Sequence, residues 1–132
     1  MSLYRKLLVW RKSHELALRV YAMSMPVLAV REPYLTNQLR RAAFSIPANI
    51  AEGSGRVTSA QFAHFLQVAI GSARELEYHL LLLRDLKLLS ASEHATLEAR
   101  TDEVTKMLVG LRKTVASRPP SKRPQPRPPS QT

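Results

Sequence analysis

Apolar residues recur three and four positions apart along most of residues 1–117, which predicts a helical protein. The clearest seam comprises Phe62, Leu66, Ala69, Ala73, Leu76, Leu80 and Leu83. Thr58 and Gln61 form a candidate capping box at the start of this helix, and Ser90 with Glu93 repeats the pattern before the next one. The last seam is Leu97, Thr101, Val104, Leu108, Leu111 and Val115. Its heptad spacing is typical of helices that pack nearly parallel in a bundle.

Two further helices are expected in the first half of the chain. The first runs from about Val9 to Met25, where Pro26 stops it. Its seam is Ala17, Val20 and Ser24, and Trp10 lies one heptad before Ala17, which favours a core role for this side chain over base stacking. The second runs from about Leu35 to Gly53. Together these segments predict an all-α fold with four helices.

The second of these helices has more apolar surface than a single core needs. One face holds Leu35, Leu39, Ala42, Ala43, Ile46 and Ile50, and a flatter second face holds Phe44, Ala48 and Ala51. Only a narrow stripe is polar: Gln38, Arg41, Ser45, Asn49 and Glu52. A helix that is apolar on most sides is buried on more than one side, so we expect the second face to meet another subunit. Pro47 should kink this helix or split it near Ser45.

Composition narrows the possible classes of protein. The 132 residues include 20 Lys and Arg against 10 Asp and Glu, for a formal net charge of +10, and no cysteine. Disulfide scaffolds, thiol catalysis and cysteine-based zinc sites are therefore excluded. No apolar run is long enough to span a membrane, and the basic N-terminus is not followed by the apolar stretch of a signal peptide. We therefore expect a cytoplasmic protein.

Positive charge gathers at both ends of the sequence. Arg5, Lys6, Arg11 and Lys12 precede any acidic residue, and residues 118–132 hold six of the nine prolines with four basic residues and no acid. Such a tail cannot bury a core, so we expect a four-helix bundle over residues 1–117 and a disordered, basic, proline-rich tail over 118–132. Basic clusters of this kind serve either solubility or nucleic-acid contact.

One long run resembles a known family. Residues 38–53 read QLRRAAFSIPANIAEG, which closely resembles the signature of the bacterial four-helix bundle proteins, also called the large-subunit ribosomal RNA intervening-sequence protein family. Supporting matches are Val9-Trp10, residues 14–17, Phe62, Phe65-Leu66, Gly71-Ser72, residues 75–77 and Asp85-Leu86. The resemblance covers about residues 4–113. The apolar link at residues 27–30 and the Pro/Arg tail depart from the family pattern.

The resemblance implies a fold, an assembly and a class of partner. Family members are expected to be antiparallel up-down four-helix bundles that form a ring-like homopentamer. The distantly similar accessory protein of diversity-generating retroelements binds nucleic acid through a basic surface and partners a reverse transcriptase. The intervening-sequence members have no firmly assigned activity.

Residues with possible chemistry are few. Arg74 and His79 fit the loose Arg-x4–6-His spacing of small helical ribonucleases, but about one such match is expected by chance and a separation of five places them on different sides of a helix. None of the four histidines has the spacing of a di-iron bundle, so we expect no metal and no cofactor. The polar stripe is either solvated or part of a partly buried network of Arg41, Asn49, Glu52 and Glu75 that fixes helix or subunit register.

The sequence thus favours a non-enzymatic, homo-oligomeric bundle that binds nucleic acid without sequence specificity, and the expected ligand is RNA or an RNA/DNA hybrid. The expected nucleic-acid-binding residues are Arg5, Lys6, Arg11, Lys12, Arg40 and Arg56. The expected oligomer interface is Phe44, Ala48 and Ala51. Two alternatives stay open: a small helical ribonuclease using Arg74 and His79, and a scaffold that binds a protein partner through the Pro/Arg tail.

Overall fold

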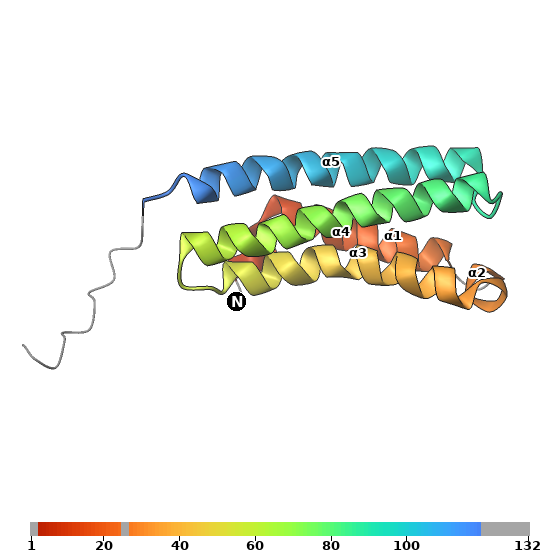
Figure 1. Cartoon of the computed structure of the whole chain (residues 1–132), viewed down its shortest axis with the longest axis horizontal. Helices are drawn as coiled ribbons and strands as arrows, with labels where there is room; N and C mark the ends of the chain where they lie inside the picture. Colours follow the sequence, from red (N-terminus) through yellow and green to blue (C-terminus); the bar gives the residue numbers. More distant parts are fainter. Residues whose placement is uncertain (1–2, 25–26, 120–132) are drawn as a thin grey trace, which may run out of the picture.

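The fold is a bundle of four long helices, seen here in a computed structural model that describes residues 3–24 and 27–119 (Figure 1). A short 3-10 helix, Leu3–Lys6, leads into the chain. The helices that follow are α1 (Leu8–Met23), α2 (Val27–Arg31), α3 (Pro33–Ser54), α4 (Ser59–Asp85) and α5 (Ala91–Ala116). The expected all-α class is confirmed, and the tail from residue 120 onward lies outside the described residues.

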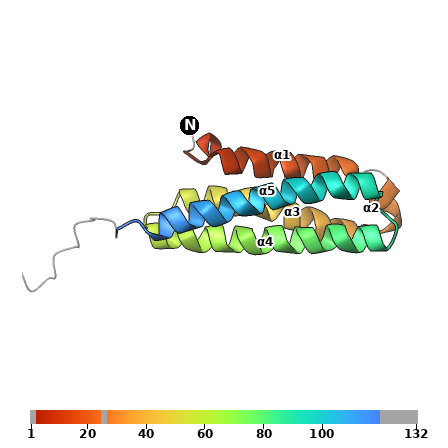
Figure 2. The same cartoon turned by 90° about the horizontal axis from the view of Figure 1, so that it is seen from above.

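Successive long helices run in opposite directions (Figure 1). α1 and α4 each pack against both α3 and α5, so α1 and α4 lie on one diagonal of the bundle and α3 and α5 on the other. Figure 2 shows α1 and α4 on opposite sides when the bundle is turned by 90°. The start of α1 and the end of α5 therefore lie at the same end of the bundle, which we call the basic end because of the residues described below.

The predicted seams form the core. Every seam residue of α4 and α5 is buried except Phe62 and Leu111, which are partly buried against it. In α3, Leu39, Ile46 and Ile50 are completely buried, and α1 contributes Val20. The heptad spacing therefore located the interior correctly, because each helix needs only one stripe to face its two neighbours.

Local signals account for the start of α4, the start of α5 and the end of α4. Thr58 and Gln61 form the predicted capping box: Thr58 Oγ1 accepts from Gln61 N over 3.1 Å, and Gln61 Oε1 accepts from Thr58 N over 3.4 Å. Ser90 Oγ accepts from Glu93 N over 3.1 Å, but the Glu93 side chain lines a cleft toward α1 instead of completing a box. α4 ends in a Schellman motif, in which Leu88 N donates to Leu83 O over 2.8 Å and Lys87 has a φ of 60°.

Two features of α3 differ from what its sequence suggests. The helix is continuous from Pro33 to Ser54, so the alternative that Pro47 splits it is wrong. Gly53, where this helix was expected to end, lies inside the helix at a close approach to α4. A Cβ at this position would lie 2.6 Å from Phe65 Cβ and 2.9 Å from Phe62 Cδ1. Glycine is therefore required here by contact between α3 and α4.

The link between α1 and α3 contains the apolar stretch at residues 27–30 that departs from the family pattern. Its described part is the short helix α2, in which Leu28 is buried, while Val27 and Val30 are exposed. Thr36 Oγ1 joins this segment to α3 by contacts to Leu28 O (3.0 Å) and Glu32 O (2.7 Å). Pro26, the predicted stop of the first helix, lies outside the described residues; α1 itself ends at Met23.

Candidate functional site

The N-terminal end of α1 is built to favour negative charge. The residue before this helix, Leu7, makes no capping hydrogen bond through its side chain, and the first turn holds no acidic residue. Arg5, Lys6 and Arg11 have exposed side chains beside these uncapped N–H groups. Basic side chains at a helix N-terminus oppose the helix dipole, so this arrangement lowers helix stability unless an anion is present.

Lys12 is the exception within this cluster. Its Nζ lies 3.1 Å from Glu103 Oε1 on α5, and both side chains are partly exposed. The ion pair joins the first turns of α1 to the middle of α5 and offsets one of the four charges. Three of the four predicted N-terminal contacts thus lack an acidic partner among the described residues.

Arg56, at the same end of the bundle, is also partly neutralised. Its Nη2 donates to Glu52 Oε1 one turn earlier, and its guanidinium lies over the ring of Phe65 at 4.8 Å from the centroid. Its side chain is still exposed. Arg56 can therefore add to a basic surface, but with less net charge than its sequence position suggests.

Arg40 is not brought to this end of the bundle. Its Nε donates to Ser24 Oγ over 2.7 Å, and its guanidinium lies 4.2 Å from the centroid of the Tyr21 ring. Arg40 therefore stabilises the C-terminal end of α1, where a cation also favours the helix dipole. It lies sixteen residues from Arg56, which is about 24 Å along a helix.

Three basic residues outside the predicted nucleic-acid-binding set also lie at this end of the bundle. Arg112, Lys113 and Arg118 lie in or just after the last turns of α5, at the end of the bundle where α1 begins (Figure 1). An up-down bundle with an even number of helices places the start of its first helix beside the end of its last helix. The bundle topology alone therefore predicts that the two basic stretches lie at the same end. We define the basic end as Arg5, Lys6, Arg11, Lys12, Arg56, Arg112, Lys113 and Arg118.

The predicted oligomer interface forms one wall of an apolar groove between α1 and α3. This groove has a volume of about 330 Å³, and its lining includes Phe44, Ala48 and Ala51 from α3 and Trp10 and Leu18 from α1. Phe44 is 43% exposed although it is a large aromatic side chain. Trp10 is only partly buried: it stacks on His14 with ring centroids 4.9 Å apart and lines the groove.

The four residues of the predicted polar network are not joined to one another within the described residues. Asn49 Nδ2 donates to Ser45 Oγ over 2.9 Å, and the hydroxyls of Ser45 and Ser72 are hydrogen-bonded at 2.7 Å. Glu52 pairs with Arg56, as described above, and Glu75 lies 3.3 Å from His79 on its own helix. Arg41 is exposed. Among the described residues, the side-chain hydrogen bond that joins α3 to α4 is therefore the uncharged Ser45–Ser72 contact.

The two residues of the ribonuclease alternative lie apart. Arg74 lines a groove between α4 and α5, whereas His79 contacts Glu75 and is mostly buried. The structure therefore does not place the two side chains in a common site.

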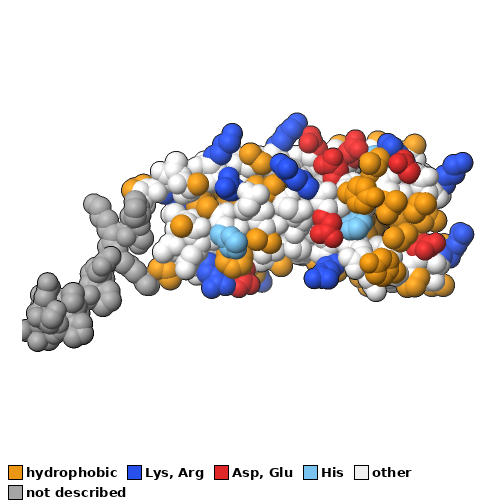
Figure 3. Space-filling view, in the orientation of Figure 1, with side chains coloured by type: hydrophobic (Ala, Val, Ile, Leu, Met, Phe, Trp, Pro, Cys, Tyr) orange, Lys and Arg blue, Asp and Glu red, His pale blue; other side chains and the backbone are white. Residues whose placement is uncertain are grey.

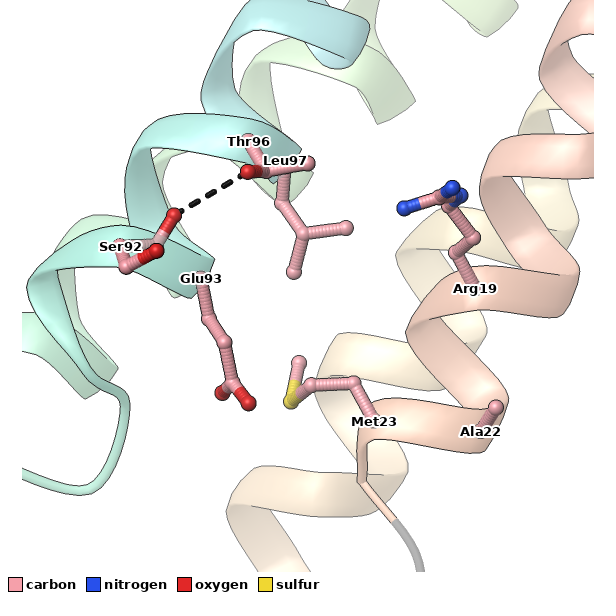
Figure 4. Close-up of a pocket in the computed structure, with 7 residues that line it drawn as sticks. All are labelled: Arg19, Ala22, Met23, Ser92, Glu93, Thr96 and Leu97. Atoms are coloured by element: carbon pink, nitrogen blue, oxygen red, sulfur yellow. Dashed lines mark hydrogen bonds between the residues drawn. The ribbon is translucent and has the colours of Figure 1, made fainter.

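A separate cleft of about 340 Å³ lies between the end of α1 and the start of α5 (Figure 4). Arg19 and Glu93 extend from its opposite walls, and Met23 and Leu97 supply apolar surface between them. Thr96 Oγ1 donates to Ser92 O over 3.1 Å on the α5 side. None of the residues predicted to bind nucleic acid or a second subunit lines this cleft.

The described residues hold neither a metal-binding cluster nor a membrane-spanning helix. Residues 3–24 and 27–119 contain no group of three or more His, Asp or Glu side chains arranged to hold a metal ion. No helix in this part of the chain is long and apolar enough to cross a membrane.

Comparison with known proteins decides the family. The model of the 23S rRNA-intervening sequence protein family matches residues 5–110. The chain belongs to this family. A crystal structure of a protein of unknown function from the S23 ribosomal protein family of Bacteroides thetaiotaomicron VPI-5482 is similar, with a TM-score of 0.74 and 28% sequence identity. The similarity covers 80% of this chain and 99% of that one. The comparison with curated proteins found no match.

Membership agrees with the resemblance carried by residues 38–53. In this member of the 23S rRNA-intervening sequence protein family, that run forms most of α3. Its apolar residues supply the core and one wall of the α1–α3 groove, and its Ser45 contacts α4. Packing between helices and the wall of the α1–α3 groove thus explain the residue types in this family signature.

Proposed function

We propose that this protein is a non-enzymatic, homo-oligomeric module that binds nucleic acid through the phosphate backbone at its basic end. The observation that carries the proposal is the start of α1, where exposed cations surround a helix N-terminus that has neither a side-chain cap nor an acidic first turn. Helix N-termini and basic side chains together form favourable sites for phosphate groups.

The end of α5 lies beside the start of α1 and enlarges the basic surface beyond a single helix end. Lys113 and Arg118 extend the charge of Arg5, Lys6 and Arg11 across the end of the bundle. Contacts made mainly to phosphates carry little sequence information, so the expected binding is non-specific and strongly dependent on salt. RNA or an RNA/DNA hybrid is the expected partner class, and a protein that acts on such nucleic acid, such as a reverse transcriptase, is a further candidate.

The α1–α3 groove supports the oligomer. Phe44, Ala48 and Leu18 leave apolar surface on one side of the bundle that a second copy would cover. In a closed ring, expected to be a pentamer, every subunit would contribute one basic end. Several weak phosphate sites on one particle would act together and raise the overall affinity.

The test is a fluorescence-anisotropy titration of labelled RNA and duplex DNA at several salt concentrations. The variant R5Q/K6Q/R11Q/K12Q is compared with R19Q/R31Q/R84Q/K87Q, which removes the same charge from exposed positions of the other half of the bundle. The proposal expects weaker binding and a flatter salt dependence only in the first variant, because each phosphate contact contributes about 0.7 to 0.9 to the log–log slope. Equal losses in both variants, or no binding by the folded wild type at low salt, would overturn it.

A further inference from the structure

Acidic residues are concentrated in one part of this basic protein. Seven of the ten Asp and Glu residues lie between residues 75 and 103, against three Lys and Arg, so this segment carries a net charge of −4 in a chain of +10. The segment comprises the second half of α4, the connecting loop and the first half of α5. In Figure 3 most of the acidic side chains on the visible face lie toward this α4–α5 loop.

A groove runs through this acidic surface. It lies between α4 and α5, has a volume of about 520 Å³, and is lined by Arg74, Glu77, Tyr78, Leu81, Glu98 and Thr105. Tyr78 is 58% exposed, so the groove presents an aromatic ring beside two carboxylates. Because α4 runs away from the basic end, Arg74 lies at the nearer end of the groove and Leu81 at the farther end.

Neither carboxylate of the groove is paired with a Lys or Arg side chain among the described residues. Among the described residues Glu77 has no ion-pair partner, and the nearest basic atom to Glu98 is His94 Nε2, at 3.5 Å from Glu98 Oε2. His94 is 4% exposed, and its Nε2 makes no hydrogen bond. A buried, unpartnered ring nitrogen therefore faces the carboxylate that lines the groove. A guanidinium can bind such a carboxylate through two parallel hydrogen bonds.

We propose that this α4–α5 groove is a docking site for a proline- and arginine-rich segment, and that its occupant is the chain's own residues 118–132. Proline-rich segments bind grooves lined by aromatic side chains, because they are already extended and lose little entropy on binding. Beyond Arg118, which belongs to the basic end, this segment supplies six prolines and three cations, Lys122, Arg123 and Arg127. The groove offers Tyr78, Glu77 and Glu98.

The length of the segment permits contact within one chain. The 18 residues from Glu98 to Ala116 span about 27 Å of helix. Residues 120–132 span about 40 Å when fully extended in a polyproline conformation. The segment can therefore return along α5 to the groove. A short tether gives a millimolar effective concentration, so even a weak contact would be well populated.

The absence of cysteine allows a direct distance measurement in the full chain. Spin labels are attached to Ala95→Cys, on the exposed side of α5 near the groove, and to Ser130→Cys in the tail, and the distance between them is measured by pulsed electron paramagnetic resonance. The docked tail should give a main distance below about 30 Å, whereas a tail directed away from α5 should give distances above about 40 Å.

Matched variants identify the contact. E77Q/E98Q should shift the distribution to the long distances, and E15Q/E32Q, which removes two acids outside the groove, should leave it unchanged. Long distances in the unmodified chain, or equal behaviour of the two double variants, would overturn the proposal. A short distance that disappears when the labelled chain is diluted with unlabelled protein would show that a second copy supplies the tail, and it would also contradict the proposal.

Discussion

Lys12 Nζ and Glu103 Oε1 lie 3.1 Å apart and form an ion pair between α1 and α5. The pair lies at the edge of the basic end, where Lys12 is one of the cations expected to meet phosphate. An exposed ion pair contributes little to stability, with typical values of about 0.2 to 1 kcal/mol. Its main effect is therefore on ligand binding, because Glu103 offsets the positive charge that Lys12 would present to a ligand.

Glu103→Gln should increase the affinity for RNA. Releasing Lys12 adds a phosphate contact, so the log–log salt slope should steepen by about 0.7 to 0.9. Glu93→Gln makes the same change in charge at the far end of α5, where Glu93 lines the α1–α5 cleft, and should leave the slope unchanged. Anisotropy titrations at several salt concentrations provide the comparison. An unchanged slope in Glu103→Gln would mean that Lys12 does not contact the nucleic acid.

Phe44→Glu should reduce the size of the particle. The substitution places a charge on the wall of the α1–α3 groove, and burying an uncompensated charge costs several kcal/mol. Val30→Glu, at an exposed apolar residue of α2 outside that groove, serves as the control. Light scattering should give a smaller mass only for Phe44→Glu, with helical content unchanged in both. A monomeric wild type at micromolar concentration would contradict the proposed oligomer.

Gly53→Ala and Gly71→Ala should have effects of opposite sign. Crowding against Phe65 costs about 1 to 3 kcal/mol, which exceeds the roughly 1 kcal/mol by which alanine favours a helix. Gly71 lies in α4 with nothing within 4 Å of an added Cβ. We expect urea unfolding to show a lower free energy of unfolding for Gly53→Ala and a rise of about 0.5 to 1 kcal/mol for Gly71→Ala. Stabilisation by both substitutions would mean that α3 and α4 are less close than described.

Lys87→Gly should raise the free energy of unfolding. Lys87 has a φ of 60°, a left-handed conformation that costs a residue with a Cβ about 1 to 2 kcal/mol. The larger entropy of glycine in the unfolded chain offsets part of this gain, which leaves about 0.5 to 1 kcal/mol. Lys106→Gly, within α5, should instead lower stability by about 1 kcal/mol. Thermal unfolding distinguishes the two. Destabilisation by Lys87→Gly would contradict the Schellman motif at this position.

The core could be predicted from the sequence because its determinants are local and periodic. Each seam, such as the one that contains Leu97 and Val104, depends only on which residues share a helix face. The Thr58–Gln61 box depends on two residues three positions apart. The left-handed Lys87 could not be foreseen, because the sequence offers lysine where glycine is usual at this position of a Schellman motif.

The polar contacts were harder to predict because a charged side chain has several partners within reach. Glu52 and Glu75 bind Arg56 and His79 on neighbouring turns instead of crossing to another helix. Partners at i and i+4 require no particular packing between helices, so they compete well with more distant ones. The contact of Arg40 with Ser24 could not be predicted from the sequence of α3, because it depends on where α1 ends.

The central claim is that nucleic acid binds at the basic end, and lysine protection tests it most directly. The chain is treated with an amine-modifying reagent with and without RNA, and modification of each lysine is read by mass spectrometry. We expect RNA to protect Lys6, Lys12 and Lys113, which belong to the basic end, and to leave Lys87, in the α4–α5 loop, as reactive as before. Protection of Lys87 with continued reactivity of Lys6 and Lys113 would contradict the account.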